Sequence, residues 1–186
     1  MSAAKSATAR DASRYILEHV ARILDSHGGT VEAAVKTIAS AKRVFVYGVG
    51  RSGLVARAFA MRLTQLGLDT FFIGETITPI VRSGDLVIIV SNTGTTMSAV
   101  QTANIARRVG AQVLAVTGNA HSKLAQAANI AITIAEERDA KRSRYAPLGT
   151  LFETAALILL DGIVADVMKE LGETESSMRG RHAIMV

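Results

Sequence analysis

Short runs of apolar residues, many of them β-branched, recur along the chain and are separated by glycine, hydroxyl and charged positions. Runs of this length and composition are typical of buried parallel strands, whose two faces are both covered by other elements. We therefore expect strands over residues 43–47, 70–73, 86–90, 112–116 and 130–134.

The segments around these runs carry apolar residues at helical spacing. The predicted helices span residues 12–26, 31–39, 54–66, 97–109, 122–128 and 148–171. Strands that alternate with helices imply parallel βαβ units with right-handed crossovers. The pattern thus predicts an α/β protein with one five-stranded parallel sheet and helices on both faces, forming a single domain over residues 1–186.

The last predicted helix, residues 148–171, is apolar nearly all round and is interrupted by Asp161. Such a helix must be buried, so we expect part of its surface to pack against another subunit. Most of the charged segment before it, residues 136–144, is expected to be a solvated loop.

Two turns rich in glycine and hydroxyl groups follow the first and third predicted strands, at residues 48–53 and 91–96. Their positions suggest the strand order 2-1-3-4-5, in which ligands bind at the switch point between the two turns. Helix N-termini supply free N–H groups there, and hydroxyls add neutral donors, so a phosphate can be held without a P-loop lysine. An ordinary Ser/Thr-rich helix cap has the same composition, so the second turn alone leaves both interpretations open.

The first turn also matches a dinucleotide-binding fingerprint, with glycines at 48, 50 and 53 and an acidic residue, Glu75, further on. Several features argue against that function. Glu75 comes beyond the glycine that ends strand two, the chain has no room for a separate substrate domain, and the second turn would have no role. Two hydroxyl turns at one switch point fit a monophosphate better, with Ser52 on one side and Ser91, Thr93 and Thr96 on the other.

Composition narrows the possible ligands. The chain has 186 residues, 49% of them apolar but only 4% aromatic, and a net charge of +5. That charge suits a small anion, whereas nucleic-acid binding is disfavoured because no Lys/Arg run is interleaved with aromatics. There are no cysteines for disulfides or thiolate metal sites. None of the four histidines (His19, His27, His121, His182) has a metal-ligand partner at helical spacing, so no metal is expected.

The sequence shows neither a signal-peptide core near its start nor an apolar stretch long enough to span a bilayer. We therefore expect a cytoplasmic protein without membrane partners.

The pair of turns resembles the sugar isomerase (SIS) domain, through Gly50-Arg51-Ser52 and Ser91-Asn92-Thr93-Gly94-Thr95-Thr96. Thr93 stands for the usual serine, and Thr95 stands where glutamate is common, which leaves the role of that carboxylate unassigned. The resemblance implies a three-layer flavodoxin-like sheet and a phosphosugar ligand. The residues that it implies for binding are Gly50, Arg51, Ser52, Ser91, Asn92, Thr93, Gly94 and Thr96.

Within the SIS proteins, the chain is most similar to the 6-phospho-3-hexuloisomerases, on segments 50–63, 74–79, 147–153 and 178–183. Only the tail after Ala183 departs, being more apolar than is typical. This resemblance implies interconversion of 3-hexulose 6-phosphate and fructose 6-phosphate through an enediol(ate), without a cofactor, by a homo-oligomer such as a tetramer. A phosphosugar-binding regulator and another SIS aldose–ketose isomerase remain as alternatives.

The resemblance implies Glu153 as the base, where desolvation at the start of an apolar helix would raise its pKa. From the sequence alone, a capping box at Thr150-x-x-Glu153 is the favoured interpretation, which the resemblance reverses. His182 is implied as a proton donor, from its own or a neighbouring subunit, although tail histidines are commonly untethered. Arg51 would counter phosphate or enediolate charge, or be a solvated turn residue.

Overall fold

The computed structural model describes residues 8–25, 30–136 and 139–184. Several sequence-based expectations fall outside these ranges: residues 1–7, the end of the first predicted helix at Ser26, and His27. The middle of the charged segment, Glu137 and Arg138, and the last two residues of the tail also lie outside them.

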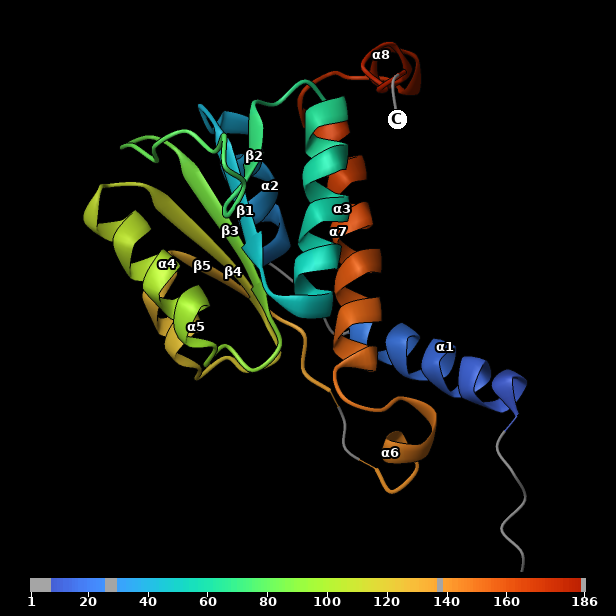
Figure 1. Ribbon diagram of the computed structural model, residues 1–186. Coiled ribbons are helices and arrows are strands. Elements are labelled where there is room, and N and C mark those ends of the chain that lie inside the picture. The colour runs from blue at the N-terminus through green and yellow to red at the C-terminus, as the bar shows by residue number, and fades with distance from the viewer. Residues whose placement is uncertain (1–7, 26–29, 137–138, 185–186) are drawn as a thin grey trace, which may run out of the picture.

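A single parallel sheet of five strands forms the centre of the molecule (Figure 1). The strands are β1 (Val44–Gly48), β2 (Thr70–Phe72), β3 (Leu86–Ser91), β4 (Gln112–Thr117) and β5 (Ile130–Thr133). Their order, β2-β1-β3-β4-β5, confirms the prediction. In the register, Gly48 pairs with Val90 and Ser91 pairs with Thr117, so the turns after β1 and β3 start side by side at one edge of the sheet.

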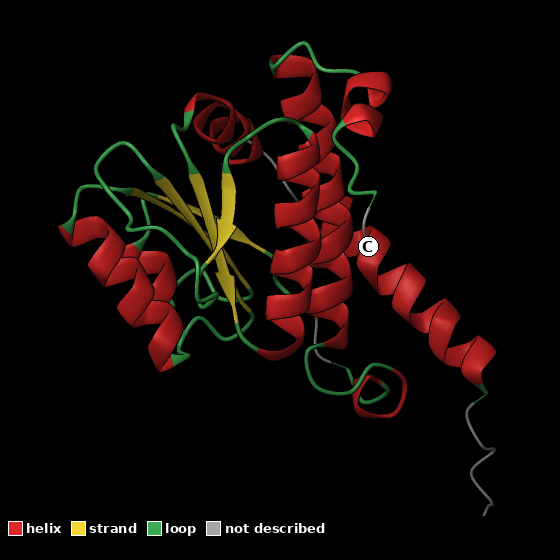
Figure 2. Cartoon of the chain, turned by 45° about the horizontal axis from the view of Figure 1, so that its top comes forward, coloured by secondary structure: helices red, strands yellow, loops and turns green. Residues whose placement is uncertain are grey.

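Helices cover both faces of the sheet, as predicted (Figures 1 and 2). One face carries α1 (Ala9–Asp25), α2 (Thr30–Ser40), α3 (Gly50–Gln65) and α7 (Thr150–Glu170), and the other carries α4 (Met97–Arg108) and α5 (Lys123–Ala127). Successive strand residues point to opposite faces. Val46 and Ile88 therefore join the core under α3 and α7, whereas Phe45, Val87 and Ile89 join the core under α4.

Two short helices were not predicted. The first, α6 (Arg142–Tyr145), lies in the charged segment, and the second, α8 (Glu175–Gly180), lies in the tail. Neither has enough residues for an apolar periodicity. The start of α8 is instead defined by a capping box between Thr174 and Ser177, which satisfies two backbone N–H groups.

The helix α3 begins four residues earlier than expected, at Gly50 rather than Leu54. The glycines that predicted a long turn serve a different purpose. A Cβ on Gly53 would lie 2.6 Å from the carbonyl oxygen of Gly48, so α3 starts directly against the end of β1. As a result Ser52 belongs to the first turn of a helix and not to a loop.

The long helix α7 buries one side against its own chain, through residues such as Leu151, Ala155 and Ile163. Its other side exposes Leu157 and Ile158 together with Asp161 and Asp166. The helix is therefore less enclosed within one chain than its composition suggested. No helix in the described ranges has both the length and the hydropathy needed to cross a bilayer.

Candidate active site

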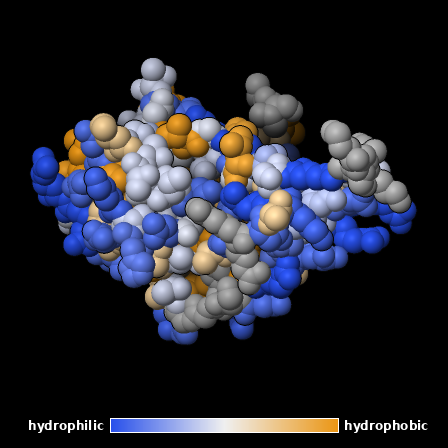
Figure 3. Space-filling view, turned by 90° about the horizontal axis from the view of Figure 1, so that it is seen from below, coloured by the Kyte–Doolittle hydropathy of each residue, from blue (hydrophilic) through white to orange (hydrophobic). Residues whose placement is uncertain are grey.

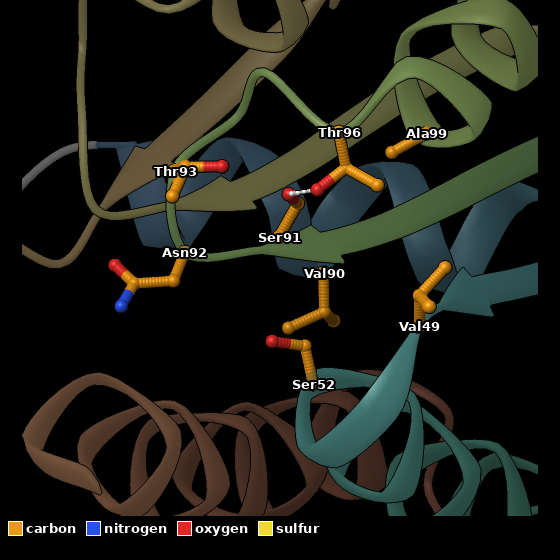
Figure 4. A pocket seen from close by; sticks show the side chains of 8 residues that line it. All are labelled: Val49, Ser52, Val90, Ser91, Asn92, Thr93, Thr96 and Ala99. Atoms are coloured by element: carbon orange, nitrogen blue, oxygen red, sulfur yellow. Dashed lines mark hydrogen bonds between the residues drawn. The ribbon is translucent and has the colours of Figure 1, made fainter. Parts of the chain in front are cut away.

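A small cavity of about 120 Å³ opens between the starts of α3 and α4, at the carboxyl ends of β1 and β3. Figure 4 shows the hydroxyl groups of Ser52, Ser91, Thr93 and Thr96 around one space, while the side chain of Asn92 points away from them. Ser52 and Ser91 are buried, and Ser91 Oγ lies 3.4 Å from Thr96 Oγ1. The structure therefore brings together the four hydroxyl residues that the sequence proposed for phosphate.

The two helices that start at this cavity have no side-chain cap. Neither Val49 before α3 nor Thr96 before α4 accepts a hydrogen bond from its own helix through a side chain. By contrast, Ser122 caps α5 through Ala125 N. The first N–H groups of a helix need partners, and uncapped helix starts that face a common cavity suit an anion.

The turn between β3 and α4 is fixed by close packing. Gly94 has a φ of 61°, and a Cβ at this position would lie 2.2 Å from Ser122 Oγ and 2.8 Å from Thr117 Oγ1. Its carbonyl oxygen accepts a hydrogen bond from Leu124 N at 3.0 Å. The start of α5 thus holds the hydroxyl turn in place, and only glycine fits there.

Glu153 lies in the first turn of α7, with a side chain only 13% exposed, and contacts Arg51, the residue before the cavity residue Ser52. Its Oε2 atom is buried and accepts no hydrogen bond within the described parts of the chain. Arg51 Nη1 lies 3.0 Å from that oxygen, which is ion-pair contact without a hydrogen bond. The Arg51 side chain is 60% exposed, so its guanidinium contacts Glu153 and is also accessible to solvent.

The capping-box interpretation of Glu153 is wrong. The N-cap residue of α7 is Gly149, not Thr150, and it makes no side-chain cap. The hydroxyl of Thr150 donates to the carbonyl oxygen of Pro147 at 2.6 Å. The N–H of Phe152 is satisfied by Glu136 Oε1 at 2.9 Å. The helix end is thus capped from a distant part of the chain, and the Glu153 carboxylate is left for another role.

A larger pocket of about 610 Å³ adjoins the first and shares Asn92 and Thr93 with it. It is also lined by Glu136, Arg142 and Gly149. The expectation that residues 136–144 form a solvated loop is therefore wrong at these two charged positions, whose side chains pair with each other and are mostly buried. Glu136 comes three residues after the end of β5, at the same end of the sheet. The sequence contained this signal, but the high charge of the segment obscured it.

His182 lies far from this site within one chain. It lines a separate pocket with Arg62 and Gln65, at the opposite end of α3 from Ser52. Figure 1 shows α8 at that end, away from the starts of α3 and α7. The neighbouring Arg181 fastens the segment by donating to the carbonyl oxygen of Gln65 at 3.1 Å and to Glu173.

Figure 3 views the molecule from the side at which α3 and α7 begin. Apolar residues form separate patches on this face, among mostly hydrophilic ones. Within the described ranges, no group of three or more His, Asp or Glu side chains is arranged to hold a metal ion.

The chain is similar to proteins of known family. The sequence model of the SIS domain family matches residues 37–160. A 3-hexulose-6-phosphate isomerase of Methanocaldococcus jannaschii is 37% identical over 158 residues, which cover 85% of this chain and 85% of that protein. The protein of the same name from Bacillus subtilis is 36% identical, over 78% of this chain and 81% of its own.

Solved structures agree with the sequence relatives. The crystal structure of a hypothetical protein from Methanococcus jannaschii, from which a function as 3-hexulose-6-phosphate isomerase was inferred, has a TM-score of 0.81 and 32% identity. The match covers 94% of this chain and 97% of that one.

Proposed function

The chain belongs to the SIS domain family, and from this membership we propose that it interconverts D-arabino-3-hexulose 6-phosphate and D-fructose 6-phosphate. The relatives with this activity in their names match most of the chain. The structural observation that carries the proposal is the buried Oε2 of Glu153, which accepts no hydrogen bond in the described residues and lies 3.0 Å from Arg51, the neighbour of the cavity residue Ser52. We treat residues 1–186 as one SIS domain.

In this proposal the substrate phosphate occupies the small cavity. The hydroxyls of Ser52, Ser91, Thr93 and Thr96 donate to its oxygens, and the uncapped starts of α3, at Gly50, and of α4, at Met97, add backbone N–H groups. Neutral donors and helix ends suffice for a dianion that is released again after each turnover.

Glu153 is the proposed base. It removes the proton from C2 of the open-chain 3-hexulose, the C2–H electron pair forms the C2–C3 double bond, and the C3 carbonyl becomes an enediolate oxygen. The O2 proton then passes to O3, and return of the proton from Glu153 to C3 gives the C2 ketone and C3 hydroxyl of fructose 6-phosphate. One carboxylate can serve both adjacent carbons. Arg51, 3.0 Å from Glu153 Oε2, would counter the enediolate charge.

His182 completes the proposal as the group that assists ring opening or protonates a substrate oxygen. Since it lies at the far end of α3 in its own chain, we propose that a neighbouring subunit supplies it. The protein would then act as a homo-oligomer, at least a dimer and in the family's pattern a tetramer, in the cytoplasm.

Incubation with ¹³C-labelled fructose 6-phosphate, followed by NMR, tests the function. We expect the signal of a 3-ketose to appear until equilibrium is reached. Appearance of an aldose instead would indicate another SIS isomerase activity. Saturable binding without any conversion would indicate a phosphosugar-binding regulator, and either result would overturn the proposed reaction.

A further inference from the structure

The start of α7, which carries Glu153, is held by a carboxylate from the segment after β5, at the same end of the sheet as the site. Glu136 follows β5 and accepts the N–H of Phe152 through Oε1 at 2.9 Å. Asn92 Nδ2 lies 3.5 Å from the same oxygen. A carboxylate at a helix N-terminus is favoured by the free N–H groups and by the helix dipole. The residue before Glu153 is therefore fixed by Glu136.

Glu136 is in turn held by Arg142 on α6. Arg142 donates to Glu136 Oε2 through Nε at 2.9 Å and through Nη2 at 2.6 Å. The side chain of Glu136 is only 9% exposed and that of Arg142 is 25% exposed. Two hydrogen bonds from one guanidinium fix direction as well as distance. This pair lies at the wall of the larger pocket and not in the hydroxyl cavity.

Arg142 also controls the backbone that leads into α7. Its Nη2 donates to the carbonyl oxygen of Leu148 at 2.6 Å. Leu148 has a φ of 59°, in the left-handed region that residues with a side chain disfavour. Within the described ranges, every other residue with a positive φ is a glycine. Its side chain is 87% exposed, so packing of the leucine does not explain the conformation. Such strain persists when the surrounding structure imposes it.

The residue after Leu148 shows why this conformation matters. A Cβ on Gly149 would lie 3.0 Å from Glu153 Oε1 and 3.2 Å from Asn92 Nδ2. The turn at residues 148 and 149 therefore passes directly against the carboxylate of the proposed base. A shift of this turn would move both the start of α7 and the wall beside Glu153.

We propose that Glu136 and Arg142 are positioning residues, which hold the start of α7 and the left-handed turn at Leu148 so that Glu153 keeps its reactive orientation. This inference rests on the proposed isomerase function. Neither residue is needed to touch the reacting carbons, because both act through the backbone that carries Glu153.

The first test compares two arginines of the same short helix. Arg142→Gln removes the bonds to Glu136 and Leu148, while Arg144→Gln removes the same charge from an exposed position outside the larger pocket. We expect Arg142→Gln to lower kcat by about 10- to 100-fold, the effect of a misplaced reacting group. KM for fructose 6-phosphate should change less than about twofold, because the phosphate site is untouched. Arg144→Gln should match the wild type.

The second test asks whether backbone conformation is the cause. Adding Leu148→Gly to Arg142→Gln should restore roughly tenfold in kcat, because glycine adopts the left-handed backbone without the penalty of a side chain. Adding Leu148→Ala to the same variant removes the leucine side chain but keeps the penalty, so it should restore nothing. A purely structural loss would be repaired by neither substitution.

The outcomes separate this inference from the proposed function. An inactive wild-type protein would overturn the function itself. An active wild type with Arg142→Gln equal to Arg144→Gln would overturn only the positioning role, as would equal rescue by glycine and alanine. A large rise in KM at constant kcat would make Arg142 a substrate contact instead.

If Arg142→Gln fails to fold, Arg142→Lys serves in its place. Lysine keeps the charge beside Glu136 but lacks the planar fork that reaches both Glu136 and Leu148. We expect a lowered kcat that Leu148→Gly restores and Leu148→Ala does not. A lysine variant with wild-type kcat would overturn the inference.

Discussion

Thr96 illustrates how single side chains define the candidate site. This residue is the N-cap of α4, yet its hydroxyl does not cap the helix and instead lies 3.4 Å from the hydroxyl of Ser91. A threonine that forgoes its usual local bond, in a cavity with three other hydroxyl residues, is available to a ligand.

Replacing Thr96 by valine should weaken phosphate binding and leave the shape of the cavity unchanged. A lost hydrogen bond to a charged group costs about 1.5–3 kcal/mol, so KM should rise about tenfold or more, with a smaller change in kcat. Steady-state kinetics measures this. Thr102→Val on the same helix is the control, because the Thr102 hydroxyl donates to Ser98 O in its own helix and does not line the cavity. An unchanged KM for Thr96→Val would remove Thr96 from the phosphate site.

Glu153→Gln tests the base directly. Glutamine keeps the size of the side chain but cannot take a proton, so kcat should fall by about 10²- to 10⁴-fold, the usual contribution of a positioned acid–base group. Glu170→Gln, at the other end of α7, should leave kcat unchanged. Circular dichroism should show both variants folded, and near wild-type turnover by Glu153→Gln would exclude it as the base.

At the level of elements, the contact between β1 and α3 decides where Ser52 sits. Gly48 and Gly53 face each other so closely that a Cβ on either would meet the other's backbone within 3.0 Å. This contact lets α3 begin at the sheet edge and point its first turn at the cavity. The glycine pattern that resembles a dinucleotide fingerprint is thus explained by helix–strand packing.

Gly53→Ala should therefore destabilise the protein. Forcing a methyl group into this contact costs about 1–3 kcal/mol and should displace Ser52, so the melting temperature should fall and KM should rise. Gly162→Ala on α7 is the matched control, because nothing lies within 4 Å of a Cβ there. It should be neutral or slightly stabilising, since alanine is the better helix former. Equal melting temperatures for the two variants would contradict the close contact.

The attachment of α8 should depend on pH through Glu173. Hydrogen bonds from Arg181 and then Ser177 lower the pKa of Glu173 from 4.5 to about 2. A depressed folded-state pKa means that the stabilisation is fully present above pH 4.5 and is lost as the pH falls toward 2. Protection of the α8 amides from hydrogen exchange, expressed relative to the intrinsic exchange rate at each pH, should accordingly fall over that range.

The α8 amides of Glu173→Gln should show low protection at all pH values. Glu175→Gln should behave like the wild type, because the ion pair that Glu175 makes among the described residues is with the exposed Arg179 on its own helix. Protection in the wild type that stays constant between pH 4.5 and 2 would show that the Glu173–Arg181 pair does not hold α8.

For the whole molecule, the apolar surface left on α3 and α7 is the main unexplained feature. Leu54 and Met61 on α3 and Ile158 on α7 are all exposed, on two helices that pack side by side. Apolar residues gathered on neighbouring helices are typical of subunit interfaces. We expect light scattering of a dilute solution to give at least a dimer, and a species of only 19.6 kDa would contradict this.

A shared active site makes a further prediction for the assembly. His182→Ala and Glu153→Gln subunits should each be nearly inactive alone. When they are mixed under conditions that allow subunit exchange, some sites combine an intact Glu153 with an intact His182 and activity should partly return. Mixing either mutant with itself is the control, and the absence of any recovery in the mixture would argue against a histidine supplied by the neighbour.

The sequence alone determined the strands, their order and the hydroxyl turn after β3, whereas the early start of α3 at Gly50 shortened the first predicted turn. These follow from local properties: apolar runs define buried strands, and glycine and hydroxyl groups mark the turns at the switch point. The four hydroxyl residues of the cavity could be found for the same reason, because each follows or begins an element whose position in the sheet is fixed by topology.

The tertiary structure decided how the start of α7 is held and what that leaves free. Thr150-x-x-Glu153 has the sequence of a capping box, but Glu136, sixteen residues upstream of the Phe152 N–H, supplies the cap. Arg142 likewise gains its role from contacts to Glu136 and Leu148. These hydrogen bonds form because the fold brings residues from separate segments within bonding distance. The local sequence around each residue does not contain that distance. The separation of His182 from Glu153 within one chain is also a tertiary property. Glu153 lies at the start of α7, whereas His182 lies near Arg62 and Gln65 at the far end of α3, which runs beside α7.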